Sequence, residues 1–313
     1  MKFHKKRLVF WLYLLTITTL MVGVLEFSLR QFFHLGNPLI YDSSPTYGYR
    51  PLPQQSIIKR SGNLINTNNL GIRANKDWNP VEKENKILFL GNSVTFGETV
   101  SNHELFSNLA LEGIDSLISG SAGVNGWGVK NIHALVKLHD FTPSETYVTV
   151  LIENDFYRGL QRASSFHGFW YTKPKSAIHQ VGMFFLREYL NNNLSHWNRT
   201  SLSPKEEEKK ADILVKDAVL ALKEIDDFLK SKGYQHQIFI SPDSSQVYKG
   251  APYDKRVKSY LEENCIEVTY LLEDVLKFRS NERGVFFYDH VHLNLIGHEV
   301  WGKVLNKHIF QEK

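Results

Sequence analysis

The chain has 313 residues, with 37 Lys and Arg residues against 33 Asp and Glu residues and a single cysteine. The four basic residues among the first seven positions account for the whole positive excess, so neither a basic face nor a nucleic-acid partner is expected. One cysteine excludes an intrachain disulfide framework. We expect Cys265 to be a small packed residue at the start of a strand.

An uncharged, mainly apolar run covers residues 8–25, about the length that spans a bilayer core. The positive-inside tendency predicts that the tail, residues 1–7, stays cytoplasmic and that the rest of the chain is translocated, because the tail contains Lys2, Lys5, Lys6 and Arg7. No small-x-small cleavage site follows the run, which favours an uncleaved transmembrane signal anchor over a cleaved signal peptide. We therefore expect a single-pass protein with a periplasmic or extracellular domain.

Residues 26–85 are rich in Pro, Asn, Gly and Ser and show little periodicity, so we expect a stalk and an irregular or short-hairpin lead-in. Residues 86–313 suffice for one large α/β domain. Helices are expected at 178–190 and from the capping motif that begins at Ser203. Apolar runs predict strands of a parallel sheet at 86–90, 115–119, 147–152, 236–241 and either 285–288 or 266–270.

The strand predicted at 86–90 runs into Gly91-Asn92-Ser93-Val94, so a serine stands where a buried strand ends and a tight turn begins. In open α/β sheets the reactive crevice lies beyond the carboxyl ends of the strands, and the N-terminus of the following helix presents N–H groups to negative charge. Ser93 is therefore a candidate nucleophile. The alternative is a glycine-rich turn with no chemical role.

Near the end of the chain, Asp289 precedes His292 by three residues. A serine nucleophile needs a base and a carboxylate that orients the base, and these two residues can supply both. The alternative is that Asp289 and Asn294 only cap the last helix. His290 and His298 lie close by in the sequence, but a catalytic zinc needs three ligands in a rigid arrangement, so we expect neither a metal nor another cofactor.

Two middle segments complete an ordered pattern: Gly126 lies in GVNGWG after the second predicted strand, and Asn154 lies in IEND after the third. With these motifs the sequence resembles the SGNH (GDSL-like) hydrolase superfamily, whose four blocks supply Ser, Gly, Asn and His in that order. The resemblance covers about residues 86–310, and residues 66–73 resemble the lead-in of membrane-anchored members. It implies a three-layer α/β/α, flavodoxin-like fold with a central parallel sheet, preceded by one transmembrane helix.

The residue types predict acyl-transfer chemistry. Ser93 would attack an ester carbonyl, while His292 would take the proton and return it to the leaving alcohol, and Asp289 would orient His292. The N–H groups of Ser93 and Gly126 and the side-chain amide of Asn154 are expected to stabilise the negative oxygen of the intermediate.

Two positions depart from the superfamily pattern. Asn92 replaces the usual Asp, a residue that shapes the turn and does not attack the substrate. Ile152 replaces the glycine usually found two residues before the third-block Asn, a change that leaves the side-chain amide of Asn154 in place.

An insertion at residues 156–202 follows the third motif and has an aromatic density well above the chain average. This position would let the insertion line the active site. We expect Trp127, Phe156 and Tyr157 to contact substrate, because aromatic faces stack well on sugar rings. Two alternatives remain open. The aromatic residues could bury a small core of the insertion itself, or they could rest on the membrane surface.

Three classes of function follow from this pattern. The leading hypothesis is a membrane-tethered, extracytoplasmic serine esterase acting on O-acyl esters, above all O-acetyl esters, of carbohydrate or lipid. The second is an O-acyltransferase that modifies a surface polysaccharide, in which a sugar hydroxyl intercepts the acyl-enzyme. The third is a non-catalytic sugar-binding module, which applies if Ile152 has displaced Asn154 or if the triad does not assemble. Expected partners are the acylated substrate, the membrane and other envelope proteins that modify polysaccharide.

Overall fold

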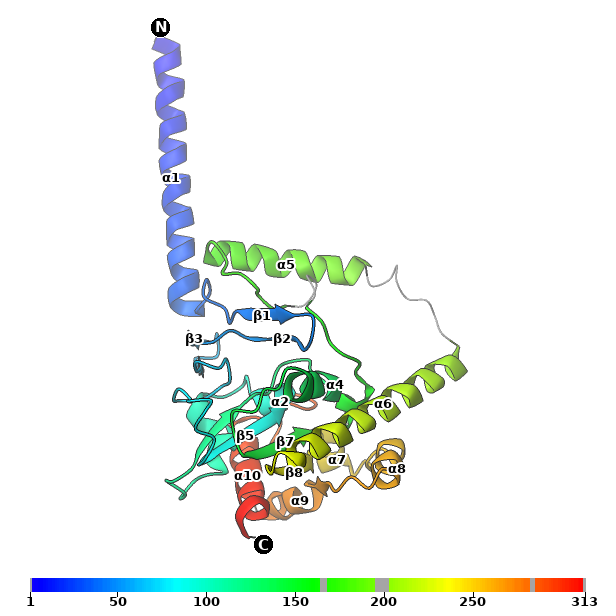
Figure 1. Ribbon diagram of the computed structural model, residues 1–313. Coiled ribbons are helices and arrows are strands. Elements are labelled where there is room, and N and C mark those ends of the chain that lie inside the picture. The colour runs from blue at the N-terminus through cyan, green and yellow to red at the C-terminus, as the bar shows by residue number, and fades with distance from the viewer. Residues whose placement is uncertain (1, 164–167, 195–202, 282–284, 312–313) are drawn as a thin grey trace.

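The structure of the protein, a computed structural model, describes residues 2–163, 168–194, 203–281 and 285–311. The described residues form a central sheet of five parallel strands in the order β6-β5-β7-β8-β9 (Figure 1). In chain order the strands are β5 Lys86–Gly91, β6 Ile118–Ser121, β7 Thr146–Leu151, β8 Gln235–Ile240 and β9 Thr269–Tyr270. This is the flavodoxin-like order, in which the second strand lies outside the first.

Helices cover both faces of the sheet. The alternation along β5 sends Leu88 and Leu90 into one core and Ile87 and Phe89 into the other. The first core is covered by α4 Val129–His133, α6 Pro204–Ser231 and α8 Lys255–Glu263. The second is covered by α3 Phe106–Leu109, α7 Ser244–Lys249, α9 Leu272–Asn281 and α10 Leu295–Asn306. The predicted three-layer α/β/α fold is confirmed.

Short helical segments complete the connections between these elements. They are α2 Ser93–Phe96, the 3₁₀ helices Asn102–Glu104 and Glu153–Tyr157, and the π-helical turns Ala134–Leu138 and Lys307–Gln311. Helix α6 begins as predicted: the Ser203 side chain accepts a hydrogen bond from the Glu206 N–H, and Pro204 takes the first helical position.

Most predicted strands are confirmed within one or two residues, and the exceptions lie at the sheet edges. The strand expected at 115–119 begins only at Ile118. Residues 266–270 supply the last strand, as the short β9, whereas 285–288 contributes a single bridge between Phe287 and Leu293. The expectation for Cys265 was wrong, because this residue is exposed and has a φ of 53° in the turn before β9.

The N-terminal helix α1 Lys2–Phe33 is longer than the apolar run at 8–25 and projects from the body of the protein (Figure 1). Its residues Lys6–Phe33 are long and apolar enough to cross a membrane, and none of the apolar window is buried inside the protein. The apolar side chains of α1 thus have few protein contacts, which suits a helix surrounded by lipid.

From about Leu39 onward, the segment expected to be a stalk instead packs into the core of the α/β domain. Residues of the lead-in form two antiparallel hairpins, β1 Tyr41–Ser44 with β2 Gly48–Pro51 and β3 Gln55–Ile58 with β4 Leu64–Thr67. Tyr49, Ile65 and Trp78 are buried in the same core as helix α6. The strands have four residues each, too few to give the sequence a clear period.

Helix α5 Ala177–Leu194 confirms the helix expected at 178–190; it begins beside the last turns of α1 and runs away from it, roughly at right angles (Figure 1). The rest of the aromatic insertion, as far as the structure describes it, does not fold as a separate unit. Phe169 packs on the rings of Tyr41 and Tyr49, at centroid distances of 4.6 and 5.0 Å. Trp197, with the rest of 195–202, lies outside the described residues.

Arg73 joins the lead-in to the segment that follows Ser93. Its buried guanidinium donates hydrogen bonds to the carbonyl oxygens of Phe96 at 2.6 Å and Gly97 at 2.5 Å, and also to that of Val100. Its Nε donates to the Asn102 side chain at 2.8 Å. Burial lowers the pKa of Arg73 to about 9, so the group remains charged at neutral pH. One side chain therefore satisfies the carbonyl groups at the C-terminal end of α2.

We predict that Arg73→Met destabilises the protein by about 3 kcal/mol or more, because several buried carbonyl oxygens lose their donors. In a protein of this size the Tm should fall by about 5 °C. Thermal unfolding of the full chain in detergent measures the effect, with the exposed Lys76→Met as the matched control. Equal Tm values for the two variants would show that Arg73 has no such role.

Candidate active site

The structure brings together Ser93, His292 and Asp289. Ser93 is the first residue of α2, directly beyond the carboxyl end of β5. Its Oγ lies 2.8 Å from His292 Nε2, although the two residues are 199 positions apart. On the other side of the ring, His292 Nδ1 lies 2.7 Å from Asp289 Oδ2. The three groups therefore form a hydrogen-bonded chain in the order that a nucleophile, a base and an orienting carboxylate require.

The loop that carries His292 is held by both oxygens of Asp289. Oδ1 accepts the N–H groups of Val291 and His292 at 2.9 and 2.8 Å, while Oδ2 bonds the ring. Burial alone would raise the pKa of Asp289, but the hydrogen bonds from His292 and Val291 hold it below its ordinary value. Thr99 Oγ1 also donates to the Leu293 carbonyl at 2.5 Å, which ties this loop to the one after α2.

The predicted oxyanion groups follow three adjacent strands. Ser93 follows β5, Gly126 lies in the loop after β6, and Asn154 comes just after β7. Because the strands are parallel, the three loops share one edge of the sheet. Among the described residues, neither the N–H groups of Ser93 and Gly126 nor the exposed Asn154 side chain has a hydrogen-bond partner. These donors are available to a ligand.

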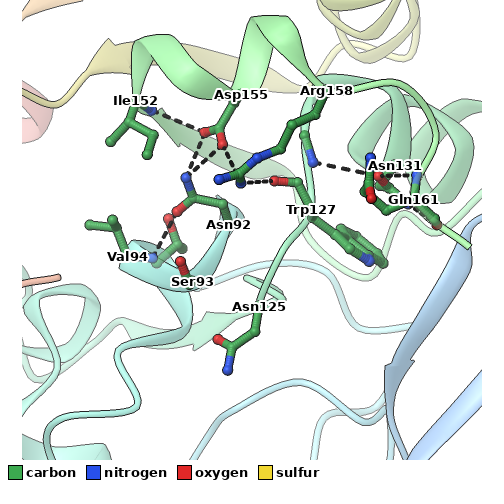
Figure 2. A network of polar contacts seen from close by, with 12 residues as sticks. Asn92, Ser93, Val94, Asn125, Trp127, Asn131, Ile152, Asp155, Arg158 and Gln161 are labelled. Carbon is green, nitrogen blue, oxygen red and sulfur yellow. Dashed lines mark hydrogen bonds and ion pairs between the residues drawn. The ribbon is translucent and has the colours of Figure 1, made fainter. Parts of the chain in front are cut away.

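A buried carboxylate links the same three loops (Figure 2). Asn92 Nδ2 donates to both oxygens of Asp155 at 2.8 and 2.7 Å, and Asn92 Oδ1 accepts the Val94 N–H at 2.7 Å as the cap of α2. Arg158 bonds Asp155 at 3.1 Å and the Trp127 carbonyl at 2.8 Å. The turns that carry Ser93, Gly126 and Asn154 are thus fixed relative to one another by one polar network.

The two departures from the superfamily pattern fit this network. The amide of Asn92 can donate to Asp155, whereas an ionised carboxylate in its place would face a second one. Ile152 has φ −106° and ψ 157°, an extended conformation open to any residue, and its N–H donates to Asp155 at 3.0 Å. Neither substitution disturbs the turn that leads to Asn154.

Burial excludes two of the three residues predicted to contact substrate. The side chains of Trp127 and Phe156 have no exposed surface and belong to the core beneath α6. Tyr157 is partly buried, packs against that core and bonds Asp254 through its hydroxyl. Aromatic residues near the motifs were expected to line the site. They are buried in the core instead, because burial of large apolar side chains is strongly favourable.

The groove beside His292 is lined mainly by residues that the sequence did not single out. It encloses about 570 Å³ between Lys59, Arg60, Ser61, Glu98, Thr99, Asn125, Tyr288, Asp289 and His292. Lys59 forms an ion pair with Glu98. Burial raises the pKa of Glu98, but Lys59 and Asn125 outweigh this and hold it below its ordinary value. The first three residues come from the turn of the β3–β4 hairpin, which no motif marks.

The neighbouring histidines have other contacts. His290 lies 3.2 Å from Asp243 and 3.1 Å from Ser244 Oγ, and so connects the loop to α7. His298 is fully buried, stacks on Phe106 and has its pKa lowered to about 3 by burial and by Arg73. In the part of the chain that the structure describes, no cluster of three His, Cys, Asp or Glu residues could hold a metal ion.

No protein-family model matches this sequence, and no curated protein matches it. Similar solved structures include a lipolytic protein of the G-D-S-L family from Veillonella parvula, with 15% identity and a TM-score of 0.40 over 73% of this chain and 99% of that one. An acetyl xylan esterase has 15% identity and a TM-score of 0.42, with 72% and 100% covered. An acetylxylan esterase from Geobacillus stearothermophilus has 13% identity and a TM-score of 0.36, with 74% and 96% covered. These likenesses concern the fold, and the contacts described above define the site.

We predict a pH-dependent stability that originates at Asp155. Burial raises its pKa to about 6, in spite of Arg158 and the N–H donors of Asn92 and Ile152. The folded protein therefore takes up this proton more readily than the unfolded chain, and the resulting stabilisation is lost as the pH rises from about 4 to 6. A shift of about two pKa units corresponds to about 3 kcal/mol.

The Tm of the wild type and of Asp155→Asn, measured between pH 4 and 7, isolates this contribution because all other groups titrate in both proteins. The wild type should lose stability relative to the variant as the pH rises. A constant difference, or one that grows in favour of the wild type, would contradict the assignment.

Proposed function

We propose that this chain is a serine ester hydrolase of the SGNH type. The observation that carries the proposal is the hydrogen-bonded chain from Asp289 through His292 to Ser93 at the carboxyl edge of a parallel sheet. A serine hydroxyl that touches an oriented imidazole at the start of a helix is suited to attack on a carbonyl carbon.

In the proposed reaction, Ser93 Oγ bonds to the ester carbonyl carbon while His292 Nε2 takes the hydroxyl proton. The negative oxygen is met by the free donors of Ser93, Gly126 and Asn154, and each such donor typically contributes about 3 to 4 kcal/mol to the transition state. His292 then returns the proton to the leaving alcohol, and a water molecule releases the acid in the second half of the cycle.

The exposure of the triad favours hydrolysis over transfer to a sugar. The side chains of His292 and Asp289 are 33% and 48% exposed, so water reaches the position that the acyl-enzyme would occupy. A transferase needs to exclude water from that intermediate. The alternative of a non-catalytic sugar-binding module required a triad that does not assemble or an Asn154 displaced by Ile152. The contact between Ser93 and His292 and the extended backbone of Ile152 favour catalysis over this alternative.

We further propose that α1 tethers the enzyme to a membrane, with the basic tail in the cytoplasm and the catalytic domain outside. The length and apolar surface of Lys6–Phe33 and the four basic residues before position 8 support this orientation. The substrates proposed are O-acyl esters, O-acetyl esters above all, of an envelope carbohydrate or lipid. Proteins that modify envelope polysaccharide are the corresponding proposed partners.

We predict that the full chain hydrolyses 4-nitrophenyl acetate and that Ser93→Ala lowers kcat by a factor of about 10³ or more, since the acyl-enzyme cannot form. Release of nitrophenol, followed by its absorbance, measures both rates. The exposed Ser116→Ala serves as the control and should keep the wild-type rate. Turnover by Ser93→Ala at the level of the control would exclude Ser93 as the nucleophile.

A further inference from the structure

Helix α5 is bonded to the last turns of α1. Glu26 of α1 accepts hydrogen bonds from the first two N–H groups of α5, those of Ala177 at 2.8 Å and Ile178 at 3.0 Å. Gln180 of α5 in turn accepts the Gly36 N–H at 2.5 Å. The unpaired donors of a helix start are therefore satisfied by a carboxylate on the helix that approaches the membrane. This contact fixes the position of α5 relative to α1.

The position of α5 places it at a membrane surface. Figure 1 shows α5 running across the direction of α1 at the end where α1 meets the domain. If α1 crosses a bilayer, α5 lies along the surface of that bilayer. Its side chains Leu186 and Tyr189 are 48% and 66% exposed and lie outside the cavity described below. Large exposed apolar side chains on a surface-lying helix are typical of helices that rest in the bilayer interface.

The charged side of α5 is turned toward the protein. The Arg187 guanidinium lies 4.6 Å from the centre of the Trp170 ring and donates to the Phe169 carbonyl at 3.3 Å. Arg187 thus contacts the domain, and Val181 and Phe184 face the cavity on the same side, while Leu186 and Tyr189 are exposed. The exposed side of α5 therefore has apolar side chains that can rest in a bilayer interface.

A cavity of about 890 Å³ lies beneath α5 and adjoins the groove beside His292. Its apolar walls include Phe33 at the end of α1, Leu39 and Tyr41 of the lead-in, Phe169, and Val181 and Phe184 of α5. Gln180, Arg187 and Glu188 of α5 also line it. At its other end, Lys59, Arg60, Glu98 and Asn125 line both this cavity and the groove beside His292. An apolar space at the membrane side thus adjoins a polar groove at the triad.

We propose that the cavity beneath α5 takes an acyl chain of a membrane lipid, and that the ester presented to Ser93 belongs to a lipid-borne substrate that enters from the bilayer. This inference rests on the proposed esterase function and narrows its substrate class to lipid. Burial of each methylene group in apolar surroundings is favourable, so the walls of the cavity would select a long chain over a short one. The membrane tether then places the opening of the cavity beside its substrate.

The test uses the full chain carrying Ser93→Ala, reconstituted in vesicles of phosphatidylcholine and phosphatidylglycerol that contain a phosphatidylcholine with a diazirine at the end of one acyl chain. Mass spectrometry after illumination locates the adducts. Adducts on peptides that contain Tyr41 or Phe169 are expected, because these residues line the cavity away from the bilayer. Labelling confined to α1 and to the exposed side of α5 would overturn the proposal without any reference to catalysis.

A matched pair of variants tests the entry of substrate. Val181→Trp places an indole ring in the cavity and obstructs it, whereas Val81→Trp adds the same ring at a site that is 84% exposed and outside both cavities. In otherwise wild-type protein, Val181→Trp should lower the ratio of vesicle-lipid hydrolysis to 4-nitrophenyl acetate hydrolysis by about tenfold, and in the Ser93→Ala background it should abolish the adducts on Tyr41 and Phe169. Val81→Trp should change neither.

Equal ratios for the two variants would overturn the proposal. Failure of the esterase function gives a different result: the wild type then hydrolyses neither ester, while the labelling of the cavity still reports whether lipid enters it.

Discussion

The buried carboxylate of Asp155 is the contact on which the geometry of the site depends. Asn92 joins it to the turn of Ser93, Arg158 joins it to the loop of Gly126, and its own backbone continues from Asn154. A buried charge is tolerated only when it is paired and hydrogen-bonded, and here its partners come from three neighbouring loops. The requirement to satisfy one carboxylate therefore fixes the relative position of the candidate nucleophile and the candidate oxyanion donors.

Two further side chains hold the site in place from outside this edge of the sheet. Arg73 holds the far end of α2 from the lead-in, and Asp289 holds His292 from the C-terminal loop. Each uses one side chain to satisfy several backbone groups, which gives a short segment a single conformation. Ser93 Oγ and His292 Nε2 come within hydrogen-bond distance because both of their loops are fixed in this way.

Sequence reasoning succeeded where the signal is local. Apolar runs predicted the central strands, and two of these strands are followed within a few residues by candidate site residues, Ser93 and Asn154. It failed where contacts between distant segments determine the position of a residue. The hairpin that brings Lys59 to the groove has strands too short for a period, and the composition around Trp127 does not distinguish an aromatic wall from an aromatic core. The bonds of Arg73 likewise depend on contacts between distant segments.

The central claim is that Ser93 is a nucleophile activated by His292. Reaction of the full chain with a fluorophosphonate, followed by mass spectrometry of its peptides, tests this claim most directly. The account predicts one adduct, on Ser93, whose formation is slowed at least about a hundredfold by His292→Gln, because the hydroxyl then lacks its base. An adduct on another residue, or labelling of Ser93 at an unchanged rate in His292→Gln, would contradict it.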